Sequence, residues 1–188
     1  MPTLRAELML KAFQKAAPLD ALLDYPKAFD SFHAFCKGEY AAENTDFWSA
    51  SGLYMKMAAK AAEPQLELEE GEEKEAAKAK ADKDAEALAA QRDTIIETYI
   101  KEGSDFQINL PSTLAKSLVE KAKTECGLTL FDEAREEIFK LMKRDTLPRY
   151  KTSEGFETLV SGLGEPMPIP DCEVPTSLES VRTKFSAS

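Results

Sequence analysis

The side chains that could perform acid–base or metal chemistry in this 188-residue chain are few in kind. His33 is the single histidine, which excludes HExxH metal sites and multi-histidine zinc sites. It lies among the apolar residues of an expected helix, and no GxSxG motif or cysteine-enzyme motif accompanies it, so a packing or surface role is a better interpretation than a general base. Neither GxxxxGK[ST] nor GxGxxG occurs. We therefore expect a protein that is not an enzyme and that binds no nucleotide, metal or cofactor.

The three cysteines, Cys36, Cys126 and Cys172, are odd in number and far apart, with no CxxC pair. This pattern favours neither a disulfide framework nor a zinc knuckle, and it fits a reducing compartment. The sequence contains no signal-peptide pattern, no run of 18 apolar residues and no prenylation box. These features predict a cytoplasmic protein without direct membrane insertion.

The charge balance excludes most phosphate-binding surfaces. Lysine and arginine number 24 against 34 aspartates and glutamates, for a net charge of −10. A chain this acidic, without a Lys/Arg-rich run, repels nucleic acid and anionic lipid. Hydrophobic residues make up 43% of the chain, which is enough to build a core. We expect one folded domain that binds no nucleic acid.

Apolar residues recur at helical spacing, strand-like alternation is hard to find, and the chain is therefore expected to be all-α. Three stripes carry this pattern: Phe29, Phe32, Cys36 and Tyr40; Phe47, Trp48, Ser51, Tyr54 and Met55; and Phe131, Ala134, Ile138, Leu141 and Met142. Pro26 is predicted at a first helical position, and Thr129 and Asp132 have the spacing of a capping box. Pro111 and Pro148 are expected to mark bends between helices.

Residues 61–92 consist almost entirely of Ala, Glu, Lys, Asp and Gln and have no evident core-facing stripe. They predict a solvated insertion, disordered from Pro64 to Gly71 and then forming an exposed Ala-rich helix that continues into Ile95 and Ile100. An acidic docking arm is the alternative, supported only by the charge. The four prolines after Gly164 predict an irregular tail over 164–188, which leaves one domain over 1–163.

A set of short blocks in a fixed order carries the most information. The blocks are Phe32–Tyr40, Glu43-Asn44-x-x-Phe47-Trp48, Ile108-Asn109-Leu110, Phe131-Asp132-Glu133-Ala134, and Leu141-Met142-x-x-Asp145-x-x-Pro148-Arg149. Together they closely resemble the RGS domain, the regulator of G-protein signalling fold, over roughly residues 20–160. The resemblance implies an all-α RGS-type bundle of about nine helices, with residues 61–92 as an enlarged connection between two core helices.

The resemblance also implies a function. Members of this family accelerate GTP hydrolysis by heterotrimeric Gα subunits, and they supply no arginine finger because Gα carries its own arginine in cis. They hold the Gα switch segments in the transition-state arrangement, which requires tighter binding to that form than to the GTP-bound ground state. We therefore expect a GTPase activator that terminates G-protein signalling, that needs no cofactor, and that Gα recruits to the inner face of the plasma membrane.

Matched to the family's motifs, the Gα-contact residues fall on three bends at one end of the bundle. They are Glu39, Tyr40, Glu43 and Asn44 on the first bend, Asn109 on the second, and Leu141, Asp145, Thr146 and Arg149 on the third. By resemblance, Asn109 braces the catalytic glutamine of Gα, since an amide both donates and accepts without adding charge. Asp145 is expected to accept hydrogen bonds from a switch threonine, with Arg149 pairing with it and orienting it.

Each of these assignments has a structural alternative. Asn109 would be a helix N-cap before Pro111, Asn44 would cap the Phe47-Trp48 helix, and Asp145 with Arg149 would form an ordinary surface i,i+4 pair. For Phe47, Trp48, Phe131 and Ile138, packing in the core is the preferred interpretation.

Three departures from the family pattern favour weaker or differently selective binding. Ala41 replaces a residue that is often serine, Thr146 stands where serine is common, and Gly52-Leu53 replaces a polar pair. The competing function is an RGS-homology scaffold that binds proteins without accelerating hydrolysis. The presence of Asn109, Asp145 and Arg149 together favours the activator. Which Gα class is preferred, and whether the chain oligomerises, the sequence leaves open.

Overall fold

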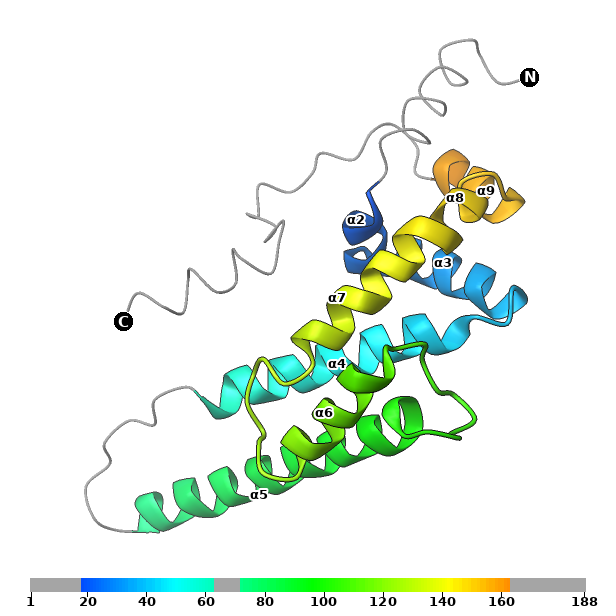
Figure 1. Cartoon of the computed structure of the whole chain (residues 1–188). Helices are drawn as coiled ribbons and strands as arrows, with labels where there is room; N and C mark the ends of the chain where they lie inside the picture. Colours follow the sequence, from blue (N-terminus) through cyan, green and yellow to red (C-terminus); the bar gives the residue numbers. More distant parts are fainter. Residues whose placement is uncertain (1–17, 63–71, 163–188) are drawn as a thin grey trace. The chain divides into compact units, whose positions relative to one another are not determined.

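The computed structural model describes residues 18–62 and 72–162 (Figure 1). Contacts divide these residues into two units, one made of 18–35 with 147–162 and the other of 36–62 with 72–146. The helices are α2 (Leu19–Asp24), α3 (Pro26–Gly38), α4 (Ala42–Ala61), α5 (Glu72–Ile95), α6 (Ser112–Ala122), α7 (Asp132–Leu141), α8 (Leu147–Tyr150) and α9 (Glu154–Gly162), with π-helical segments η1 (Ile96–Ile100) and η2 (Met142–Thr146). Every regular element in the described ranges is a helix, so the all-α prediction is confirmed. The predicted tail over 164–188 lies outside the described residues.

In the first unit, α3, α8 and α9 pack around Tyr150. This side chain is fully buried, and its ring centroid lies 5.1 Å from that of Phe32, 5.5 Å from that of Phe35 and 5.3 Å from that of Phe156. The Tyr150 hydroxyl donates to Ser31 Oγ at 2.9 Å, which satisfies its one polar group. Proline stands at the first position of α3, as the sequence predicts.

His33 also lies in this unit. Its ring stacks on that of Phe29, with centroids 5.9 Å apart and planes 5° apart. This contact supports the packing role that the sequence indicates.

In the second unit, α4 and α5 run antiparallel (Figure 1). Lys60 near the end of α4 pairs with Asp84 at 3.5 Å, whereas Ala50, earlier in α4, accepts a hydrogen bond from Gln91 Nε2, later in α5, at 3.4 Å. Leu88 is only 5% exposed, so the last turns of the Ala-rich helix reach the core, contrary to the expectation that they face solvent.

The predicted continuation of this helix into the isoleucines is confirmed, since Ile95, Ile96 and Ile100 are buried. The stretch expected to be disordered, 64–71, lies outside the described residues. That residues 61–92 form an enlarged insertion stays a prediction.

The core of the second unit is built on Phe131. Its ring meets those of Tyr54 at 4.9 Å and Phe47 at 6.4 Å, both edge to face, and all three side chains are fully buried. With the buried Ile138, these residues confirm the core role predicted for Phe47, Phe131 and Ile138, whereas Trp48 is only half-buried.

The capping box predicted at Thr129 is wrong. Helix α7 begins at Asp132, after the N-cap residue Phe131, and the backbone N–H of Asp132 donates to the Thr129 carbonyl at 3.2 Å. A backbone turn therefore takes the place of the side-chain cap, because Phe131 is drawn into the core at the position that a capping residue would otherwise occupy.

Tyr54 makes the stability of this core dependent on alkaline pH. Burial raises the pKa of Tyr54 to about 12, Cys126 adds to the rise and Arg92 opposes it. Because the folded-state pKa lies above the ordinary value of 10.0, the stabilisation is complete below pH 10 and is lost as the pH rises through 12. We expect the free energy of unfolding, measured with urea, to fall by roughly 2 kcal/mol more in the wild type than in Tyr54→Phe between pH 10 and 12. Equal falls in the two proteins would contradict this.

Candidate partner-binding surface

The second unit carries eight of the nine predicted contact residues on three bends. They are Glu39, Tyr40, Glu43, Asn44, Asn109, Leu141, Asp145 and Thr146. The ninth, Arg149, is an exposed residue of α8 in the other unit.

The first bend holds Tyr40 in a strained conformation. Helix α3 ends at Gly38, and Ala41 N–H donates back to the Cys36 carbonyl at 2.9 Å. This turn gives Tyr40 a φ of 55° and leaves its side chain 96% exposed, so the prediction that Tyr40 continues the apolar stripe of α3 is wrong. A left-handed non-glycine residue costs of order 1–3 kcal/mol, and such strain tends to collect at functional sites.

Tyr40→Asn tests whether this strain serves binding. Asparagine tolerates the left-handed region, so we expect the free energy of unfolding to stay level or rise by up to about 1 kcal/mol. Binding to the protein's partner should weaken at the same time, because an exposed aromatic side chain is lost from the surface. Thermal unfolding and partner titration measure the two effects. If the variant binds as well as the wild type, Tyr40 is not a contact residue.

Asn44 is the third residue of α4 and is 5% exposed. Its Nδ2 donates to Glu43 Oε1 at 3.0 Å and to the Ala41 carbonyl at 3.4 Å, while its Oδ1 has no hydrogen-bond partner among the described residues. Both bonds are donated by the side chain, whereas capping needs an acceptor for a first-turn N–H, so the capping alternative for Asn44 is wrong. The N-cap residue is Ala41, and α4 therefore lacks an N-cap hydroxyl.

The second bend presents Asn109 from a braced loop. Gly103, with a φ of 84°, donates its N–H to Gln107 Oε1 at 2.9 Å, and Ile108, 2% exposed, donates its N–H to the Tyr99 carbonyl at 2.9 Å. Asn109 itself is exposed. The N-cap residue of α6 is Pro111, so the N-cap alternative for Asn109 is wrong.

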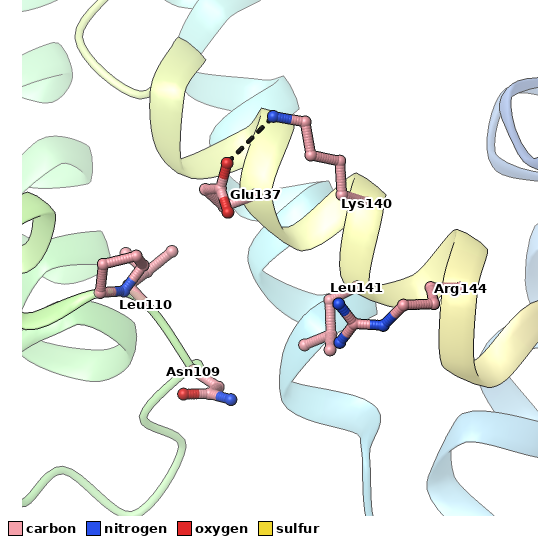
Figure 2. A pocket seen from close by; sticks show the side chains of 7 residues that line it. Asn109, Leu110, Glu137, Lys140, Leu141 and Arg144 are labelled. Atoms are coloured by element: carbon pink, nitrogen blue, oxygen red, sulfur yellow. Dashed lines mark hydrogen bonds and ion pairs between the residues drawn. The ribbon is translucent and has the colours of Figure 1, made fainter.

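An open pocket of roughly 380 Å³ joins this bend to α7 (Figure 2). It is lined by Asn109, Leu110, Pro111, Glu137, Lys140, Leu141 and Arg144. Asn109 and Leu141, predicted as contacts from separate bends, thus border the same depression. Lys140 on its rim pairs with Glu136 at 2.9 Å and Glu137 at 3.1 Å.

The third bend is η2, which contains Asp145 and the buried Thr146. The Asp145 carboxylate accepts two hydrogen bonds from Arg144, from Nε to Oδ1 at 2.9 Å and from Nη2 to Oδ2 at 3.1 Å. These bonds raise the pKa of the Arg144 guanidinium above its ordinary value. The Asp145–Arg149 pair stays a prediction, because the two residues belong to different units.

Arg135 is a residue of this region that the sequence analysis missed. It is 8% exposed, its Nη1 donates to the Trp48 carbonyl at 2.7 Å and to Ser51 Oγ, and its guanidinium carbon lies 3.7 Å from the centre of the Trp48 ring. Arg135 therefore ties α7, which ends at Leu141, to the middle of α4. No local signal separates it from its solvated neighbours Glu133 and Glu136.

A family model for the regulator of G protein signaling domain matches residues 18–159, well over half of the chain. The chain belongs to the RGS family. The match confirms the resemblance that the sequence blocks carry.

The relatives that match this RGS protein also carry the name of this family. Regulator of G-protein signaling 5 of Mus musculus is 30% identical over 142 residues, which cover 76% of this chain and 64% of the mouse protein. Regulator of G-protein signaling 21 of Homo sapiens is 27% identical over 143 residues, covering 76% and 77% of the two chains. Regulator of G-protein signaling 1 of Equus caballus is 28% identical over 153 residues, covering 81% and 64%. The chain thus spans less than two thirds of the length of the mouse and horse relatives.

Within residues 18–62 and 72–162, none of the helices combines the length and apolarity needed to cross a bilayer.

Proposed function

We propose that this RGS protein binds Gα subunits and accelerates their GTP hydrolysis. The observation that carries the proposal is the exposed Asn109, held by a braced loop beside Leu141 at the rim of an open pocket. A side chain that supports a transition state works best from a backbone that is fixed before the partner arrives, and the bonds of Gly103 and Ile108 hold the loop that leads into Asn109.

The mechanism is preorganisation of Gα rather than chemistry on this chain. The Asn109 amide donates and accepts without adding charge, so it can brace the glutamine that positions the attacking water in Gα. Asp145, with its carboxylate held in place, accepts hydrogen bonds from a switch segment. Gα supplies the arginine and the glutamine, and its membrane association brings this protein to the inner face of the plasma membrane.

The deciding experiment is single-turnover hydrolysis of GTP preloaded on Gα, with and without this protein. It is paired with binding to Gα held in the transition-state mimic with GDP, aluminium fluoride and magnesium, and to Gα bound to a non-hydrolysable GTP analogue. Faster hydrolysis and tighter binding to the mimic are expected, because only differential binding lowers the barrier. Binding without acceleration would favour the scaffold function. Neither binding nor acceleration across a panel of Gα subunits would overturn the proposal.

A further inference from the structure

Arg144 is an exposed cation that forms a two-point hydrogen-bonded ion pair with Asp145. Its side chain is 75% exposed, yet Nε and Nη2 each reach a different oxygen of the neighbouring Asp145 carboxylate. We propose that Arg144 is a positioning residue of the Gα-contact surface, which fixes the Asp145 carboxylate in the orientation that accepts hydrogen bonds from Gα. This inference rests on the proposed function.

The geometry suits positioning. Two parallel N–H to O bonds from a planar guanidinium fix both the place and the plane of a carboxylate, which a single bond cannot do. The ionised carboxylate has about four acceptor sites, and the fork from Arg144 uses one on each oxygen. Arg144 therefore orders the acceptor without consuming it.

A purely structural role explains the pair poorly. The Arg144 side chain is 75% exposed and that of Asp145 is half-buried at 43%, and ion pairs at such exposure contribute little to stability. The location, in contrast, is specific. Arg144 lines the same pocket as Asn109 and Leu141 (Figure 2). The pair thus stands among predicted contact residues and not on an unrelated face.

Lys143 provides a matched control. It is the preceding residue, it is exposed, and its Nζ lies 5.9 Å from the centre of the Phe139 ring. Lys143→Ala removes the same unit of charge from the same end of α7 without removing the fork that holds Asp145. Arg144→Lys keeps the charge and removes the fork.

The test measures affinity for Gα with GDP, aluminium fluoride and magnesium, together with the midpoint of thermal unfolding. We expect Arg144→Ala to weaken binding by roughly tenfold, Arg144→Lys by an intermediate factor and Lys143→Ala by less than about twofold, with unfolding midpoints unchanged. Equal losses for Arg144→Ala and Lys143→Ala would reduce Arg144 to general electrostatics and overturn the proposal.

A double-mutant cycle with Asp145→Asn separates positioning from direct contact with Gα. If Arg144 acts through Asp145, Arg144→Ala should have almost no further effect in the Asp145→Asn background. A full tenfold loss in that background would overturn the proposal, because Arg144 would then act independently. Failure of the wild type to prefer the transition-state mimic would instead overturn the proposed function, so the two failures are distinguishable.

Discussion

Replacing Asn109 with alanine is expected to cut the acceleration of Gα-catalysed GTP hydrolysis by about 10- to 100-fold. Hydrogen bonds to groups near developing charge are worth about 1.5–3 kcal/mol, and each 1.4 kcal/mol is a factor of ten in rate. Asn109 is exposed and neither caps α6 nor joins the core, so its removal should leave helix content and the unfolding midpoint unchanged. Single-turnover hydrolysis and circular dichroism measure the two quantities.

The control for this variant is Lys123→Ala. Lys123 directly follows α6, at the far end of that helix from Asn109, and is paired only with the neighbouring Glu120 among the described contacts. It should retain the full acceleration. Asn109→Asp adds a second test, since it keeps an acceptor, loses the donor and adds a charge. Unchanged acceleration by Asn109→Ala would remove Asn109 from the site and leave the scaffold function as the better account.

The second large effect is expected at Arg135. Arg135→Ala removes the contact with the Trp48 ring and leaves the buried Ser51 hydroxyl without its donor. Breaking a buried charged network typically costs 2–4 kcal/mol or more, and we expect a loss of that size in the free energy of unfolding. Arg135 is not among the predicted contact residues, so partner binding should weaken only as far as unfolding reduces the folded fraction. Urea unfolding at fixed pH measures the stability.

Two comparisons make this prediction specific. Arg135→Lys keeps the charge and loses the planar stacking, so it should lose part of the stability. Lys140→Ala, on the exposed face of the same helix, should change the free energy of unfolding by less than about 0.5 kcal/mol. A wild-type free energy of unfolding in Arg135→Ala would show that the buried guanidinium is dispensable.

The helical class and the core were predictable because they depend on repetition. Phe47, Phe131 and Ile138 belong to series of apolar residues at helical spacing, and this spacing alone predicts that they are buried. The exposure of Tyr40 was not predicted, because the same apolar spacing continues past Gly38, where the helix ends and Tyr40 adopts a left-handed conformation. The spacing of apolar residues does not show where a helix ends, and Gly38 was the local signal that the helix stops before Tyr40.

The contacts of Arg135 and the hydrogen bond that Gln107 accepts were not predicted for a different reason. Their partners, the Trp48 carbonyl and the Gly103 N–H, are backbone groups, which every residue type possesses and which therefore leave no mark in the sequence. The contact residues themselves came from family resemblance, and geometry then supported the exposed placement of Asn109 and removed two of the capping alternatives.

The two π-helical segments, η1 and η2, change the direction in which the residues after them point from the helix axis. In η1 the N–H of Lys101 bonds to the carbonyl of Ile96, five residues back, so each such turn holds one residue more than an α-helical turn. An extra residue advances everything after it by about 100° around the helix axis. Because η2 contains Asp145, deleting one residue there would restore a regular helix and swing the carboxylate to another face. A relative that lacks this extra residue would align with a gap inside a helix and not in a loop. Insertion or deletion of one residue within a helix can therefore change which side chains this surface presents to a partner.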